Sequence, residues 1–151
     1  MSTSLAPLVL AERAVPRYTS YPTAPHFSAA VGAPDATAWL SALDRDASVS
    51  LYIHVPYCRD ICAYCGCHTK ATRKARPLDD YTETLLAEID LLASTTAARR
   101  VTHLHWGGGT PSLLGPERIT RLVERLRDRF DLSCIVEHAI ELDPRTVDQP
   151  L

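Results

Sequence analysis

The run Cys58-Arg-Asp-Ile-Cys62-Ala-Tyr-Cys65-Gly-Cys67 places several thiols in one short segment of this 151-residue chain. Its first three cysteines have a CxxxCxxC spacing and follow the apolar stretch 51–56. Three thiolates are one too few to complete a cubane iron–sulfur cluster or a tetrahedral zinc site. An incomplete ligand set leaves one metal position open, as catalysis at a metal requires.

The spacing by itself leaves a second interpretation equally open. Cys67 or His68 could supply a fourth ligand and complete a structural zinc site. The fifth cysteine, Cys134, stands alone in an apolar run, and we expect it in the core as a small hydrophobic residue.

Two further polar clusters have residue types suited to ligand binding. Gly107-Gly-Gly-Thr-Pro111 allows a ligand to approach the backbone closely and permits positive φ, so that amide groups can bond a carboxylate or an amine. Glu141, in Glu141-Leu-Asp-Pro144, can accept hydrogen bonds from ribose hydroxyls or an amino group. A triple glycine is a weak signal alone, because tight turns also use it.

The elements that position these clusters follow from hydrophobic periodicity. Apolar and β-branched runs predict strands over 50–55, 101–106 and 135–142, the first of them buried on both faces. Helical spacing predicts helices over 79–93 and 116–130, and a short one over 35–43. Alternating strands and helices indicate an α/β fold with a parallel sheet. All three polar clusters follow strand ends, where such sheets place their chemistry.

Composition excludes several function classes. A hydrophobic content of 46%, a charged content of 23% and a net charge of −2 are typical of a globular protein and give no basis for binding nucleic acid. No apolar stretch reaches the roughly twenty residues of a membrane span. The apolar segment 5–11 lacks the basic start of a signal peptide. Clustered thiols do not resemble a disulfide framework, so we expect a cytoplasmic protein.

The cysteine spacing resembles that of the radical S-adenosylmethionine superfamily, in which three cysteines hold a [4Fe-4S] cluster and the cofactor chelates the fourth iron. Further motifs narrow the resemblance to the oxygen-independent coproporphyrinogen III oxidases (coproporphyrinogen dehydrogenases) of haem synthesis. These motifs are Arg17-Tyr-Thr-Ser-Tyr-Pro-Thr23, Tyr52-Ile-His-Val-Pro-Tyr-Cys58, Gly66-Cys67 and His105-Trp-Gly-Gly-Gly-Thr-Pro111.

The resemblance implies a fold and a division of the chain. The superfamily has a partial, TIM-like (β/α)6 barrel, of which this chain would supply the first three βα units. Residues 1–49 would form a leader that covers the substrate, and residues 50–151 the first half of the barrel. We therefore expect a fragment of a larger enzyme that does not turn over substrate alone.

The resemblance also assigns metal ligands and one cofactor site. Cys58, Cys62 and Cys65 would ligate the cluster, whereas Cys67 would not. Tyr52 would lie beside the sulfonium of the first S-adenosylmethionine, where an aromatic face can meet a cation. Alternatively, Tyr52 is an ordinary buried strand residue.

The remaining assignments complete two cofactor sites. Gly108 and Glu141 would contact the first S-adenosylmethionine, and Gly109 and Thr110 a second molecule. Tyr64 stands where the family has an aromatic residue against the second adenine. His54, within the family's Tyr-x-His-x-Pro pattern, would join Tyr52 in a catalytic role, although a lone strand histidine is more often a core residue.

The implied activity is oxidative decarboxylation of coproporphyrinogen III to protoporphyrinogen IX. A 5′-deoxyadenosyl radical made from S-adenosylmethionine would remove a hydrogen atom from a propionate, with loss of CO₂ and an electron leaving a vinyl group. A reductant such as flavodoxin or ferredoxin would supply electrons, and the full-length enzyme would be a monomer. A related haem-chaperone type, which binds and delivers haem, is the rival function, and Gly66-Cys67 and the motif at 17–23 argue against it.

Overall fold

The computed structural model describes residues 23–145. Contacts divide the chain between Ala33 and Pro34 into two units. The described part of the first contains the 3₁₀ helix η1 (Ala24–His26). The motif at 17–23 lies, apart from Thr23, outside the described residues, and the predicted functional division at residue 49 stays a prediction.

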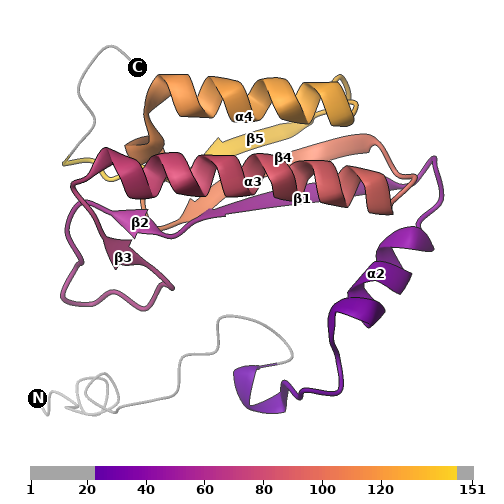
Figure 1. Ribbon diagram of the computed structural model, residues 1–151, viewed down its shortest axis with the longest axis horizontal. Helices are drawn as coiled ribbons and strands as arrows, with labels where there is room; N and C mark the ends of the chain where they lie inside the picture. Colours follow the sequence, from indigo (N-terminus) through magenta and orange to yellow (C-terminus); the bar gives the residue numbers. More distant parts are fainter. Residues whose placement is uncertain (1–22, 146–151) are drawn as a thin grey trace, which may run out of the picture. The chain divides into compact units, whose positions relative to one another are not determined.

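A parallel sheet forms the centre of the second unit. Its strands are β1 (Ser48–Val55), β4 (Arg100–Gly108) and β5 (Glu137–Ile140), in the order β1-β4-β5. Helix α3 (Ala75–Thr95) follows β1, helix α4 (Gly115–Arg129) follows β4, and both lie on one side of the sheet (Figure 1). Doubly wound sheets have helices on both faces, whereas strands in chain order with helices on one face are typical of a β/α barrel. The α/β prediction is confirmed.

The core lies between the sheet and these two helices. From α4, Leu122 and Leu126 are buried in it, and so is Phe130 directly after the helix, while Ile119 and Val123 of the same face are partly buried. Strand β1 is not buried on both faces as predicted. Its inner residues Ile53 and Val55 are buried, but Tyr52 on the other face is 61% exposed. Buried and exposed side chains alternate along β1 because helices cover only one face of the sheet within residues 23–145.

Helices begin slightly earlier than predicted. Helix α2 (Ala33–Ser41) starts two residues before the expected range, with Pro34 in its first turn. Helix α3 starts at Ala75 rather than residue 79, with Pro77 in the first turn. The first turn of a helix tolerates proline because its N–H groups have no partner within the helix.

The ends of the cysteine loop are pinned by an element that the sequence did not predict. Strands β2 (Tyr57–Cys58) and β3 (Lys70–Ala71) form a two-stranded parallel sheet. The Lys70 amide donates to the Pro56 carbonyl at 2.9 Å, and the Thr72 amide to the Cys58 carbonyl at 2.9 Å. Cys58 therefore belongs to a paired strand, while Cys62 and Cys65 lie in the loop between the strands.

Acidic residues of α3 face arginines of α4 along the contact between the two helices. The pairs are Asp79–Arg118 at 2.6 Å, Glu83–Arg121 at 2.6 Å, Asp90–Arg129 at 2.7 Å and Asp90–Arg125. Each exposed pair contributes little, but together they fix the parallel register of the helices. The amino ends of both helices consequently lie near the cysteine loop. Among the described helices, none is long and apolar enough to cross a membrane.

Candidate metal and cofactor site

The three polar clusters meet at the carboxyl edge of the sheet, as predicted. The glycine turn at the end of β4 is bonded on one side to the end of β1 and the residues that lead into the cysteine loop, through the Gly109 amide to the Val55 carbonyl at 2.8 Å and the Thr110 amide to the Tyr57 carbonyl at 2.7 Å. On its other side, the Gly108 amide donates to Glu141 Oε2 at 3.0 Å. The turn therefore links the loop after β1 to the carboxylate after β5.

The three predicted ligands have distinct surroundings. Cys58 Sγ accepts hydrogen bonds from the Thr110 hydroxyl at 3.4 Å and the Thr69 hydroxyl at 3.5 Å. The Arg145 guanidinium lies 3.7 Å from Cys62 Sγ. Cys65 closes a turn through its amide to the Cys62 carbonyl at 2.9 Å. Hydroxyl and guanidinium donors stabilise a sulfur that carries negative charge.

The donor set fits a cluster with three thiolate ligands. Within residues 23–145, no three Cys, His, Asp or Glu side chains converge on a position for a single ion. A cubane does not need that convergence, because each thiolate bonds a different iron atom. The loop offers three partly buried thiols, two of them with donors already on sulfur.

Cys67 lies close enough to the ligand group to interact with it. Burial raises the pKa of the Cys67 thiol, and the neighbouring Cys65 raises it further. Cys67 is exposed, and its assignment as a residue outside the ligand set stays a prediction.

Only glycine fits at two positions of the turn. Gly108 has φ +103°, and a Cβ there would lie 2.6 Å from His54 Cε1. A Cβ on Gly109 would lie 2.5 Å from the Tyr57 carbonyl oxygen, which is backbone and cannot yield easily. The turn thus packs directly against the end of β1 and the start of the loop.

Tyr52 and His54 form a hydrogen-bonded pair on the face of the sheet that the helices leave uncovered. His54 Nε2 lies 2.9 Å from the His68 carbonyl and is therefore the protonated nitrogen, so that Nδ1 accepts from the Tyr52 hydroxyl at 3.3 Å. Partial desolvation raises the pKa of Tyr52, and the charges of Glu141 and Cys67 add to this effect. Tyr52 is not an ordinary buried strand residue, since its side chain is mostly exposed.

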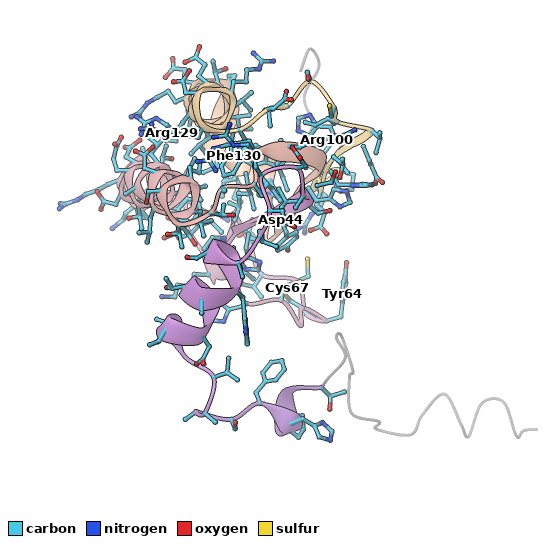
Figure 2. The ribbon with its side chains drawn as sticks, turned by 90° about the vertical axis from the view of Figure 1, so that its right-hand side faces the viewer. Asp44, Tyr64, Cys67, Arg100, Arg129 and Phe130 are labelled. Atoms are coloured by element: carbon cyan, nitrogen blue, oxygen red, sulfur yellow. The ribbon has the colours of Figure 1, made fainter. Side chains whose placement is uncertain are left out.

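The remaining predicted residues lie on the same edge with different accessibility. Tyr64 is 79% exposed and projects from the cysteine loop (Figure 2). Thr110 is buried, and its polar groups bond within the chain: its amide to the Tyr57 carbonyl, its carbonyl to the Leu113 amide, and its hydroxyl to Cys58. Their predicted contacts with a second cofactor stay predictions.

Sequence reasoning missed two residues of this site and misplaced one. Thr69 had no distinguishing motif, although it bonds Cys58. Arg145 directly follows the Asp143-Pro144 pair that marks the strand end, which was the available signal. The hydrogen bonds that Arg145 donates to Asp143 lower the pKa of that carboxyl group to about 2. Cys134 is only half-buried, because it lies in the loop before β5 and beside Ser133 rather than in the core.

Replacing Tyr81 with phenylalanine should loosen the end of β1. The Tyr81 hydroxyl donates to the His54 carbonyl at 2.6 Å, and burial raises its pKa to about 12. The pKa in an unfolded chain is about 10. Its stabilising effect is therefore complete below pH 10 and is lost between about pH 10 and 12. We expect Tyr81→Phe to lower the free energy of unfolding by about 1 kcal/mol near pH 8, as measured by urea denaturation.

The same variant should lose less stability than the parent between pH 10 and 12, because the titrating hydroxyl is gone. An equally steep alkaline loss in both proteins would assign the effect to other groups.

A basic cavity of about 420 Å³ lies beside the cysteine loop on the side of the helices. Its charged lining consists of Arg59, Arg73, Lys74 and Arg118. Two of these are paired, Arg73 with Asp60 at 2.5 Å and Arg118 with Asp79. The cavity therefore has an excess of positive charge next to the loop.

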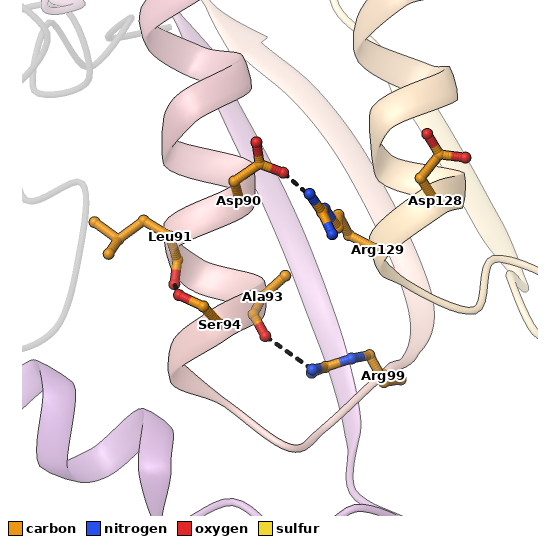
Figure 3. A pocket seen from close by; sticks show the side chains of 7 residues that line it. All are labelled: Asp90, Leu91, Ala93, Ser94, Arg99, Asp128 and Arg129. Carbon is orange, nitrogen blue, oxygen red and sulfur yellow. Dashed lines mark hydrogen bonds and ion pairs between the residues drawn. The ribbon is translucent and has the colours of Figure 1, made fainter.

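A second cavity, of about 500 Å³, lies at the opposite ends of α3 and α4 (Figure 3). Figure 3 shows Asp90 paired with Arg129 and Arg99 donating to the Ala93 carbonyl. The first contact measures 2.7 Å and the second 2.8 Å. It is formed where the carboxyl ends of the helices meet the amino end of β4. None of the predicted site residues lines it.

Comparisons with known proteins agree with the resemblance seen in the sequence. The chain is 48% identical over 137 residues to the oxygen-independent coproporphyrinogen III oxidase of Bradyrhizobium diazoefficiens. It is 45% identical over 143 residues to that of Paracoccus denitrificans and 43% identical over 135 residues to that of Escherichia coli. These matches cover 90%, 94% and 88% of this chain. The chain spans about a third of the relatives' length, at 30%, 32% and 29%.

A solved structure matches the fold. Coproporphyrinogen III oxidase (HemN) from Escherichia coli, described as a radical SAM enzyme, aligns with a TM-score of 0.78 and 37% sequence identity. The alignment covers 93% of this chain and 31% of that one. No family model matches the chain.

Proposed function

From its similarity to the oxygen-independent coproporphyrinogen III oxidases, we propose that this chain forms the cluster and cofactor site of such an enzyme. The observation that supports this most is the contact between the CxxxCxxC loop, the glycine turn and Glu141 at one edge of the sheet. Three thiols with one cofactor-binding turn beside them suit a cluster with an open iron.

Cys58, Cys62 and Cys65 would hold a [4Fe-4S] cluster and leave one iron without a protein ligand. When bound, the cluster and S-adenosylmethionine supply the electron and the 5′-deoxyadenosyl radical that removes a hydrogen atom from the substrate. The chain's share is to hold the thiolates, orient the cofactor and exclude water. Hydroxyl donors on Cys58 and the guanidinium beside Cys62 would stabilise the negative charge on the ligating sulfurs.

The turn and its partners would orient the first S-adenosylmethionine. The Gly108 amide and the Glu141 carboxylate form one polar surface, suited to the amino acid or ribose groups of the cofactor. Tyr52, held by His54, would present its ring to the sulfonium. Gly109, Thr110 and Tyr64 would lie against a second S-adenosylmethionine.

The proposed substrate is coproporphyrinogen III. Each of two propionates would give a hydrogen atom to the 5′-deoxyadenosyl radical and then lose CO₂ and one electron, which leaves a vinyl group. The electron released would offset the one consumed when S-adenosylmethionine is cleaved, so each step would use one S-adenosylmethionine and no net electron. The excess positive charge around Arg59 and Lys74 favours the approach of an anionic substrate to the loop. A reductant such as flavodoxin or ferredoxin, a monomeric enzyme and a cytoplasmic location remain predictions.

Cleavage of S-adenosylmethionine tests this proposal. We expect anaerobically reconstituted protein with dithionite to release 5′-deoxyadenosine, measured by liquid chromatography and mass spectrometry, and Cys58→Ala protein to release none. Haem binding by the reconstituted protein without any cleavage of S-adenosylmethionine would instead favour the haem-chaperone function.

A further inference from the structure

We propose that Thr69 and Thr110 are positioning residues that hold the Cys58 sulfur and make the cluster easier to reduce. This inference rests on the proposed function, because Cys58 is a ligand only if the loop holds a cluster. Both hydroxyls donate to the same atom, Cys58 Sγ, at 3.5 and 3.4 Å. Distances of this length are within the range for hydrogen bonds to the larger sulfur atom.

The two hydroxyls reach the sulfur from separate parts of the chain. Thr110 follows the glycine turn after β4 and is 6% exposed, with its amide fixed to the Tyr57 carbonyl at 2.7 Å. Thr69 immediately precedes β3, whose first residue, Lys70, is bonded back to Pro56. Both backbones are therefore anchored beside β2: Thr110 outside the cysteine loop, and Thr69 at its paired end rather than in its middle.

The three proposed ligands therefore differ in how they are supported. Cys58 has a paired strand and two hydroxyl donors, whereas Cys62 lies beside a guanidinium and Cys65 interacts with the thiol of Cys67. A ligand fixed in advance costs less entropy to order when the metal binds. Among the three, Cys58 is thus the ligand that is most firmly positioned before any metal binds.

Hydrogen bonds to a ligating sulfur also affect electron uptake. Reduction adds negative charge that is shared by the iron and the sulfurs, and a hydroxyl dipole directed at sulfur stabilises the more negative state. Each hydrogen bond should therefore raise the reduction potential. A net contribution of the usual size changes the ratio of reduced to oxidised cluster roughly two- to tenfold at a fixed solution potential. That ratio corresponds to about 20 to 60 mV for one electron.

Isosteric substitutions test the role of the hydroxyls. The variants are Thr110→Val and Thr69→Val, with Thr110→Ser and Thr69→Ser restoring each hydroxyl. Thr72→Val is the matched control, because the Thr72 hydroxyl bonds the backbone of Lys74 and not a sulfur. The full chain is reconstituted anaerobically, and iron, sulfide and the reduction potential are measured, the last by EPR-monitored titration.

We expect both valine variants to shift the potential to more negative values, additively in the double variant. The serine variants and Thr72→Val should remain near the parent. Unchanged potentials in the valine variants would overturn the inference while leaving the cluster assignment intact. Loss of the cluster in both the valine and the serine variants would also overturn it, because a hydroxyl would then not be the group that matters. Zinc in place of a cluster in the parent would overturn the proposed function and this inference together.

Discussion

Replacing Cys58, Cys62 or Cys65 with alanine should reduce iron binding from about four atoms per chain to almost none. Each proposed ligand holds one iron of a cubane, and an incomplete cubane exposes iron to solvent and to loss. The three variants are reconstituted anaerobically in parallel with the parent. Iron and sulfide are counted, and the visible absorption from sulfur-to-iron charge transfer is recorded. Circular dichroism establishes that each variant is folded.

Two cysteines outside the proposed set serve as controls. Cys134→Ala should retain a full cluster, since Cys134 lies in the loop before β5 beside Ser133. Cys67→Ala should also retain it, although Cys67 interacts with Cys65. Loss of iron in the Cys67 variant, with iron retained in one of the three ligand variants, would show that the ligand set has been assigned incorrectly.

Gly108→Val should abolish binding of S-adenosylmethionine while leaving the cluster in place. Position 108 has φ +103°, and its Cβ would lie 2.6 Å from the His54 ring, which in turn holds Tyr52. A β-branched side chain there would displace both aromatic residues and occupy the space beside the turn. Isothermal titration of the reconstituted protein with S-adenosylmethionine measures the effect, and iron counting verifies the cluster.

Gly115→Ala is the matched control for backbone strain. Gly115 also has positive φ, at +76°, but a Cβ there meets nothing within 4 Å. It should therefore lower stability slightly without affecting cofactor affinity. Equal loss of affinity in both glycine variants would attribute the effect to strain rather than to the site.

Glu141→Ala should weaken cofactor binding by about 1.5–3 kcal/mol, the usual contribution of a charge-assisted hydrogen bond. The carboxylate accepts from the Gly108 amide at 3.0 Å, so its loss removes a ligand group and frees the turn. The same titration measures the loss of affinity. Glu137→Ala, which removes a carboxylate four residues earlier, on β5, is the control. Unchanged affinity after the Glu141 substitution would exclude this carboxylate from the cofactor site.

The meeting of the clusters at one edge of the sheet was predictable from the sequence. Parallel strands bring their carboxyl ends together, so the loop after Val55, the turn at Gly108 and the carboxylate of Glu141 had to lie near one another. The positive φ at Gly108 was likewise predictable, because glycine is the residue that adopts positive φ without strain. These inferences succeeded because they depend on strand order and residue type alone.

Other features could not be inferred because they depend on tertiary contacts. Strands β2 and β3 contain two residues each and have no periodicity to detect. Their pairing is what brings Thr69 to Cys58 across a separation of eleven residues. Strand β1 was wrongly expected to be buried on both faces, because its apolar residues Leu51, Ile53 and Val55 were read as one continuous run although Tyr52 and His54 alternate with them. The start of α3 was placed too late because the apolar spacing begins only after Pro77, which the structure places in the first turn.

Mössbauer spectroscopy of the reconstituted protein, with and without S-adenosylmethionine, tests the central claim most directly. A cubane held by Cys58, Cys62 and Cys65 has one iron without a protein ligand. We predict a [4Fe-4S] spectrum in which the cofactor shifts the signal of one iron and leaves the other three unchanged. Stoichiometric zinc without visible absorption, or a cluster whose spectrum the cofactor does not alter, would contradict it.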